Sequence, residues 1–329
     1  MHRDHRFKPA WWLKNPHLQT VYARFAGRKR AVPTRQEIVE LPDGDFIDCR
    51  WAGGDVGPII VILHGLEGSV ESHYVKGMMR AALALGWRSV LVHFRSCGDS
   101  LNRLARTYHS GDTGDIAEYV RILREREPNT PLMAVGYSLG GNVLLKWLGE
   151  TKGENPLAAA VAVSVPFDLD KATAKMAQGI FWGYQQYFLN PLKKKIIEKA
   201  KLLNLPYDLA AVKAIVSIRE YDERVTAPLH GFKDAIDYYR QSSSRIFMPH
   251  IKIPTLVIQA EDDPFMGANT IPPVHEVSEH VRMEVYDQGG HVGFVSGLNP
   301  FRPQYWLEKR IPMFFEEQLA ALKKPFRVA

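Results

Sequence analysis

The sequence lacks long apolar runs and has very few cysteines. Its 329 residues contain only Cys49 and Cys97, and their spacing matches neither a zinc site nor a redox pair. We therefore expect a reduced, cytoplasmic protein. No apolar stretch reaches the length of a membrane helix, and the opening residues are charged and have no apolar centre. The sequence thus predicts neither a signal peptide nor stable membrane insertion.

Strong charge of either sign is also missing. The formal net charge of +6 is small for this length, and the basic clusters are short. They read GRKR at residues 27–30 and KKK at residues 193–195. Clusters of this size are usually solvated surface, so we expect no nucleic-acid partner.

Short apolar runs alternate with helical patterns over the first half of the chain. The runs IIVIL, SVLVHF, PLMAVG and LAAAVAVSV read as strands, and a hairpin turned at PDGD precedes them. Such alternation predicts an α/β fold with a mostly parallel central sheet flanked by helices. We expect a single domain over residues 1–329, with residues 1–35 as an N-terminal extension packing on the core.

The alternation breaks over residues 167–250, where helical patterns occur without a convincing strand. Strand signals resume at residues 253–260 and 281–287. The helical stretch is therefore predicted to be a cap inserted between two strands of the sheet. Its aromatic residues either line a pocket or pack the insertion onto the sheet; they are Phe181, Trp182, Tyr184, Tyr187 and Phe188.

The segment VGYSLGGN, at residues 135–142, joins a predicted strand to a predicted helix. A Gly-x-Ser-x-Gly pattern at such a junction is typical of a nucleophile elbow, which exposes a serine at the sheet edge. Gly136 and Gly140 would leave room for the turn, and the helix would point its positive end at the serine. The pattern predicts Ser138 as a nucleophile.

A serine nucleophile needs a histidine base and a carboxylate that orients it. His291 lies in QGGHVGF, on the loop after the last strand, where glycines allow the ring to approach the serine. The carboxylate is expected between serine and histidine in sequence. Asp263, before Pro264 in VIQAEDDPF, is the first candidate, Asp262 the second and Asp168 the third.

The oxyanion of an acyl-transfer intermediate needs preorganised N–H donors. One is expected from Leu139, directly after the serine. The other is expected from Leu66 in LHGLEGS, the loop after the first core strand.

With HGLEG, GYSLGG, DDPF and GGHVGF in this order, the chain resembles the α/β-hydrolase superfamily. The segments NPHLQTVYARF and HFRSCGDSLNRLARTYHSGDTGDI resemble its YheT-like branch, the fourth α/β-hydrolase family. The resemblance covers nearly the whole chain. It implies a carboxylesterase with a triad of Ser138, Asp263 and His291, and a helical cap between the sixth and seventh strands. The animal relatives carry a membrane anchor that this sequence lacks, which favours the soluble bacterial type.

These observations predict a serine carboxylesterase that needs no metal or cofactor and acts on a small-molecule or lipid-like ester. Two alternatives remain: an acyltransferase or lipase-type enzyme with the same triad, and a non-catalytic binding protein on the same fold. His109 and Asp112, in YHSGDTGD, either contact substrate or brace the loop beneath the site, and a structural role is favoured. Cys97 is expected to be a packing residue.

Overall fold

The computed structural model describes residues 6–26, 31–177, 182–203, 205 and 207–322. Its central sheet has eight strands in the order β1-β2-β4-β3-β5-β6-β7-β8. The first two strands form an antiparallel hairpin, β2 pairs antiparallel with β4, and every pairing from β4 to β8 is parallel. The strands are β1 (Arg35–Glu40), β2 (Phe46–Ala52), β3 (Ile59–Leu63), β4 (Arg88–Val92), β5 (Leu132–Tyr137), β6 (Ala159–Val163), β7 (Thr255–Ala260) and β8 (Val281–Tyr286).

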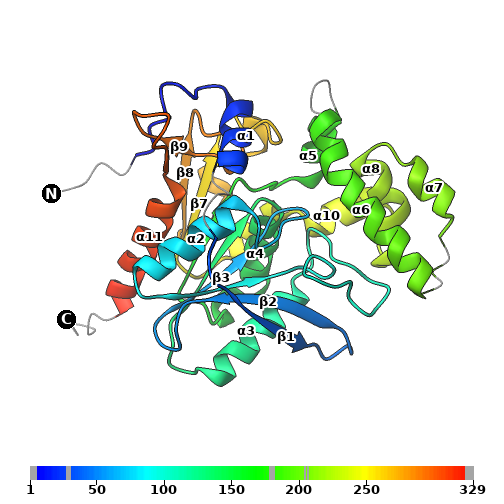
Figure 1. Ribbon diagram of the computed structural model, residues 1–329, viewed down its shortest axis with the longest axis horizontal. Helices are drawn as coiled ribbons and strands as arrows, with labels where there is room; N and C mark the ends of the chain where they lie inside the picture. The colour runs from blue at the N-terminus through cyan, green and yellow to red at the C-terminus, as the bar shows by residue number, and fades with distance from the viewer. Residues whose placement is uncertain (1–5, 27–30, 178–181, 204, 206, 323–329) are drawn as a thin grey trace.

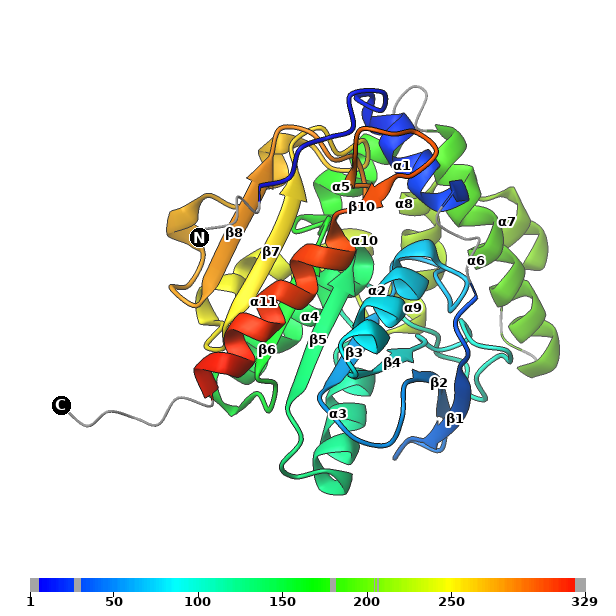
Figure 2. The same ribbon diagram turned by 60° about the vertical axis from the view of Figure 1, so that its left-hand side comes forward.

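Helices cover both faces of this sheet (Figure 2). One face is covered by α2 (His73–Ala84) and α11 (Leu307–Leu322), the other by α3 (Gly114–Arg126) and α4 (Leu139–Thr151). Side chains of β3 alternate between these two layers, as the two-residue repeat of a strand requires. Ile60 and Ile62 pack with α2 and α11, whereas Ile59, Val61 and Leu63 pack with α3 and α4. Burying each such side chain contributes about 1.5–3 kcal/mol.

A group of helices is inserted in the chain between β6 and β7, the sixth and seventh strands, which pair directly in the sheet. Figure 1 shows α6, α7 and α8 standing beside the sheet rather than on either of its faces. The cap helices are α5 (Leu169–Met176), α6 (Trp182–Leu203), α7 (Leu209–Ala214), α8 (Ile218–Tyr221), α9 (Ala227–Leu229) and α10 (Ala235–Ser242). The predicted mostly parallel sheet with a helical insertion after the sixth strand is confirmed.

The N-terminal segment lies against the loop that follows β8. It contains helix α1 (Pro16–Ala26), and two short strands, β9 (Val295–Ser296) and β10 (Gln304–Tyr305), pair beside it. The Gln19 side-chain amide donates to the Leu13 and Val295 carbonyls, and its oxygen accepts from the Val295 N–H. Gln19 is fully buried, so these bonds satisfy polar atoms that water cannot reach. None of the helices in the described ranges is both long and apolar enough to cross a bilayer.

Candidate active site

Ser138 occupies a sharp turn between β5 and α4. Its φ of 53° and ψ of −120° are strained values for a residue with a side chain. A Cβ on Gly136 would lie 2.4 Å from the Gly140 carbonyl oxygen, and one on Gly140 would lie 2.5 Å from the Leu63 and His64 carbonyl oxygens. The turn therefore closes only because both positions are glycine, as the pattern GYSLG predicts.

The side chains of Ser138, His291 and Asp263 meet at the carboxyl ends of the strands. The Ser138 hydroxyl lies 2.9 Å from His291 Nε2, and His291 Nδ1 lies 2.8 Å from Asp263 Oδ2. The ionised carboxylate can only accept, so Nδ1 carries the proton and Nε2 accepts from the serine hydroxyl. This is the tautomer in which a histidine can act as a base toward serine.

Asp263, rather than Asp262 or Asp168, contacts the histidine. Its second oxygen, Oδ1, accepts from the backbone N–H groups of Phe265 and Met266 at 2.9 and 3.3 Å, and the residue is 1% exposed. Asp262 instead accepts from the Gly290 N–H at 2.9 Å, and burial raises the pKa of its carboxyl. Asp168 caps the N-terminus of α5.

Contacts from three distant segments fix the loop that carries His291. The His291 N–H donates to Thr20 Oγ1 on α1 at 2.9 Å, and the next N–H, of Val292, donates to Ser164 Oγ at 3.0 Å. The Phe265 ring packs edge-on against the imidazole, with centroids 4.5 Å apart. Thr20 was not identified from the sequence because its partner lies 271 residues away and no local pattern links them.

The loop after β3 passes directly beside the serine. A Cβ on Gly65 would lie 3.2 Å from Ser138 Cβ, and the Gly65 N–H donates to the Tyr74 hydroxyl at 2.9 Å. His64 braces the same turn: Nε2 accepts from the Phe94 N–H at 3.1 Å, so Nδ1 carries the proton and donates to the Gly65 carbonyl at 2.7 Å. Burial lowers the pKa of His64 to about 3, which keeps the ring neutral.

The two predicted oxyanion donors belong to the two segments that meet at Ser138, the start of α4 and the loop after β3. Leu139 is the first residue of α4, and the first N–H groups of a helix have no acceptor within the helix. Leu66 follows Gly65 in the braced turn. Both residues also line the cavity next to Ser138.

An ion pair joins the loop after β3 to the cap. Lys195 Nζ on α6 lies 2.8 Å from Glu67 Oε2, and the two side chains are 22% and 6% exposed. The Tyr108 hydroxyl donates to the same carboxylate at 2.8 Å, and Lys195 Nζ lies 3.1 Å from Cys97 Sγ. The prediction that the KKK cluster is solvated surface is therefore wrong for Lys195. The GRKR cluster lies outside the described residues.

Two cavities meet at Ser138 and His291. The smaller, of about 110 Å³, lies between the sheet edge and the cap, and most of its lining is apolar. The larger, of about 420 Å³, is bordered by α1, the loop after β3 and the start of α6. Tyr184, Tyr187 and Phe188 line the larger cavity. Phe181 lies outside the described residues, and the side chain of Trp182 is not described.

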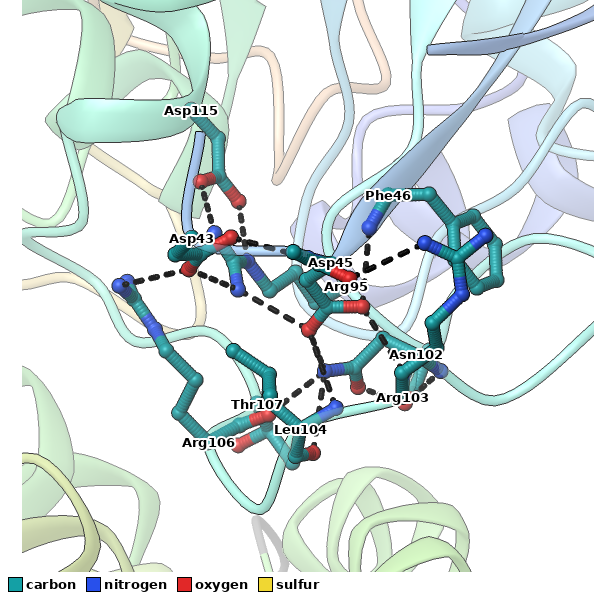
Figure 3. Close-up of polar contacts among 12 residues, drawn as sticks. Asp43, Asp45, Phe46, Arg95, Asn102, Arg103, Leu104, Arg106, Thr107 and Asp115 are labelled. Carbon is teal, nitrogen blue, oxygen red and sulfur yellow. Dashed lines mark hydrogen bonds and ion pairs between the residues drawn. The ribbon is translucent and has the colours of Figure 1, made fainter. Parts of the chain in front are cut away.

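A network of buried charges supports the long loop between β4 and α3 (Figure 3). Arg95, 3% exposed, binds Asp115 through two nitrogens at 2.7 and 2.8 Å, and also contacts Asp43 and Asp45. Arg106 Nη2 donates to both carboxylate oxygens of Asp112, at 3.0 and 2.8 Å. These contacts give Asp112 a structural place, whereas His109, on the same loop, lines the smaller cavity.

Comparison with known proteins agrees with this fold. The family model described as the alpha/beta hydrolase fold matches residues 58–298, and the chain belongs to that family. It is 42% identical, over 96% of its own length and 94% of the relative's, to "Putative esterase YheT" of Escherichia coli (strain K12). The chain thus groups with the YheT-like esterases.

More distant relatives share most of the chain. "Phospholipase ABHD3" of Mus musculus is 28% identical over 91% of this chain and 75% of its own. Among solved structures, the esterase Pf2001 of Pyrococcus furiosus superposes with a TM-score of 0.58, covering 88% of this chain and 92% of that chain. Its sequence identity is 18%, so this likeness supports the fold alone.

Proposed function

We propose that this α/β-hydrolase is a serine carboxylesterase that works through an acyl-enzyme on Ser138. The observation that carries the proposal is the chain of two hydrogen bonds, Ser138 Oγ to His291 Nε2 at 2.9 Å and His291 Nδ1 to Asp263 Oδ2 at 2.8 Å. A serine hydroxyl becomes an effective nucleophile when such a base removes its proton.

The reaction follows from the positions of these groups. His291 takes the proton as Ser138 Oγ attacks the ester carbonyl, and Asp263 stabilises the resulting imidazolium. The Leu66 and Leu139 amides donate to the oxyanion, each contributing about 3–4 kcal/mol to transition-state stabilisation. His291 then protonates the departing alcohol, and water repeats the sequence on the acyl-serine. These residues need no metal or cofactor for the chemistry.

The two cavities divide the substrate between them. The acyl group stays on the enzyme while alcohol leaves and water enters, so it belongs in the smaller, mostly apolar cavity under the cap. The alcohol belongs in the larger cavity, which His291 also borders. The names of the relatives, an esterase and a phospholipase, support a small or lipid-like carboxylic ester as substrate.

The test combines active-site labelling with turnover. A fluorophosphonate probe is expected to label the wild type and not Ser138→Ala, whereas Ser69→Ala, a second serine bordering the larger cavity, is expected to be labelled normally. Hydrolysis of p-nitrophenyl butanoate is expected to fall by about 10⁴-fold or more in Ser138→Ala and His291→Ala. Equal labelling of wild type and Ser138→Ala would exclude the proposal.

A further inference from the structure

The smaller cavity beside Ser138 has a mixed lining. Much of it is apolar, with Met176, Phe188, Leu192, Ile218 and Val225 contributed by the cap. Polar residues from the cap and from the loop between β4 and α3 also line it; they include Thr107, His109, Asp222, Thr226 and Tyr239. A pocket for a plain hydrocarbon chain has no need of a carboxylate and an imidazole, because burying them is costly.

Asp222 is a buried carboxylate held by two hydroxyl groups. It is 8% exposed, and each oxygen accepts one hydroxyl at 2.8 Å, Oδ1 from Thr226 and Oδ2 from Tyr239. Within the described part of the chain, no lysine or arginine pairs with it, and burial raises its pKa to about 6. A carboxylate oxygen can accept more than one hydrogen bond, so Asp222 keeps acceptor capacity.

The backbone that carries Asp222 is unusual as well. Residues Asp222–Thr226 form a π-helical turn between α8 and α9. Such wide turns are rare, and they occur frequently at functional sites. The turn places Asp222, Val225 and Thr226 on the cavity wall together.

His109 provides a donor on the same cavity. Its Nδ1 accepts from the Gly111 N–H at 3.2 Å, so the proton of the neutral ring resides on Nε2. Burial lowers the pKa of His109 to about 3, so the ring is neutral at physiological pH. Among the hydrogen bonds of the described residues, none uses this Nε2. The His230, Phe232 and Tyr238 rings pack against the imidazole at 4.7–5.6 Å and fix its orientation.

The loop that presents His109 is held from two sides. Asn102 is bonded to Asp45 and to the Leu104 and Arg106 carbonyls, as the core network in Figure 3 shows. From the cap, Lys199 Nζ donates to Asn102 Oδ1 at 2.6 Å and to the Arg106 carbonyl at 2.9 Å. Loop and cap are thereby joined, which fixes the loop that carries His109 against the cap that carries Asp222 before substrate arrives.

We propose that the smaller cavity selects acyl groups that carry a hydroxyl beyond the ester carbonyl, with His109 donating to that hydroxyl and Asp222 accepting from it. This assignment rests on the proposed function, because it takes the smaller cavity as the acyl side. A hydroxyl suits these two groups because it can accept a hydrogen bond from His109 and donate one to Asp222. A substrate without it leaves buried polar groups unpaired, which is a strong source of discrimination.

The test compares matched methyl esters by titration of the released acid. Methyl hexanoate is compared with methyl 3-hydroxyhexanoate and methyl 6-hydroxyhexanoate, which add a hydroxyl to the acyl group. Ethyl hexanoate is compared with 2-hydroxyethyl hexanoate, which adds a hydroxyl to the alcohol group instead. We expect the wild type to prefer at least one hydroxyacyl ester by tenfold or more in kcat/KM and to show no such preference on the alcohol side. Asp222→Leu is expected to remove most of the preference, and His109→Phe, which keeps the ring packing, to reduce it.

The measured quantity is a ratio of two substrates on one protein sample, so a partly unfolded variant does not mimic the effect. Glu279→Leu, at a side chain that is 86% exposed, is the matched acid-to-leucine control and is expected to keep the wild-type ratio. Equal kcat/KM for the hydroxyacyl and plain esters in the wild type overturns the inference, as does a preference confined to the alcohol side. Turnover that persists in Ser138→Ala overturns the proposed function instead.

Discussion

Glu67 and Lys195 form a 2.8 Å ion pair between the loop beside Ser138 and helix α6 of the cap. Glu67 follows Leu66, one of the two proposed oxyanion donors. Its φ of 54° shows that the loop holds a left-handed conformation at this residue. The pair therefore ties the position of the cap to the geometry of the oxyanion loop.

Lys195→Met is expected to lower the free energy of unfolding by about 2 kcal/mol, because it leaves the Glu67 carboxylate buried without its cation. The double variant Glu67→Gln/Lys195→Met is expected to lose less than the two single variants combined. Urea unfolding measures both. Lys194→Met, on the neighbouring residue with a 76% exposed side chain, is the control and is expected to change little. Additive losses would show that the pair is not coupled.

Thr20→Val is expected to lower kcat about tenfold and to change KM little. The substitution keeps the shape of the side chain but removes the oxygen that accepts from the His291 N–H, and leaving this part-buried N–H without a partner costs about 1 kcal/mol. Steady-state hydrolysis of p-nitrophenyl butanoate gives both constants. Thr151→Val, at a threonine that bonds only within its own helix region and to Asn155, is the matched control. An unchanged kcat in Thr20→Val would mean that the other contacts suffice to hold the histidine.

Ser138→Gly is expected to be more stable than Ser138→Ala by about 1 kcal/mol, the reverse of the usual order of these residues in a helix. The reason is the φ of 53° at this position, which alanine tolerates poorly and glycine adopts readily. Neither variant has the nucleophile, so both are expected to be inactive. Thermal and urea unfolding of the two variants give the difference. If Ser138→Ala is as stable as Ser138→Gly or more stable, the backbone at this turn is not strained.

Stability is expected to fall as the pH drops below about 6.5. Burial lowers the pKa values of His64, His109 and His230 to about 3. Between about pH 3 and 6.5 the unfolded chain binds protons at these rings and the folded chain does not, so the free energy of unfolding rises with pH. Each ring contributes a slope of up to about 1.4 kcal/mol per pH unit.

Urea unfolding at pH 4, 5, 6 and 7 measures this slope. His109→Phe is expected to reduce it by up to about 1.4 kcal/mol per pH unit, most fully near pH 5, since one proton-binding site disappears from the unfolded state. Asp222 acts in the opposite direction, because its raised pKa of about 6 makes the folded state the better proton binder between about pH 4 and 6. A slope that is the same in His109→Phe and wild type would contradict the burial of this ring.

The strands and the position of the serine follow from local sequence. A short run rich in β-branched residues, such as IIVIL, is typical of a strand buried on both faces, and the alternation of such runs with helical patterns indicates a mostly parallel sheet. The elbow is likewise encoded locally, because the close approaches at Gly136 and Gly140 exclude any other residue. The order of motifs, the glycines beside His291 and the proline after Asp263 selected these two residues as candidates, and the structure brings both side chains into line with Ser138.

Contacts that depend on how the cap and the N-terminal helix dock were not predicted. Lys195 lies in a lysine run that looks like surface, and only the packing of α6 brings it to Glu67. Asp222 and His109 are separated by over a hundred residues in sequence, and nothing near either one indicates a shared cavity. A structural role was favoured for His109 over contact with substrate, and its Nε2 donor, which has no partner among the described residues, becomes evident only when the Gly111 bond fixes the tautomer.

Helix α1 lies outside the segment that the family model covers, which starts at residue 58. A fragment trimmed to that boundary would retain all three side chains of the proposed triad and both proposed oxyanion donors. It would nevertheless lose Thr20, the side chain that holds the backbone of the histidine in place. Shortened versions of this enzyme chosen from family boundaries alone would keep the reactive groups and discard part of what aligns them.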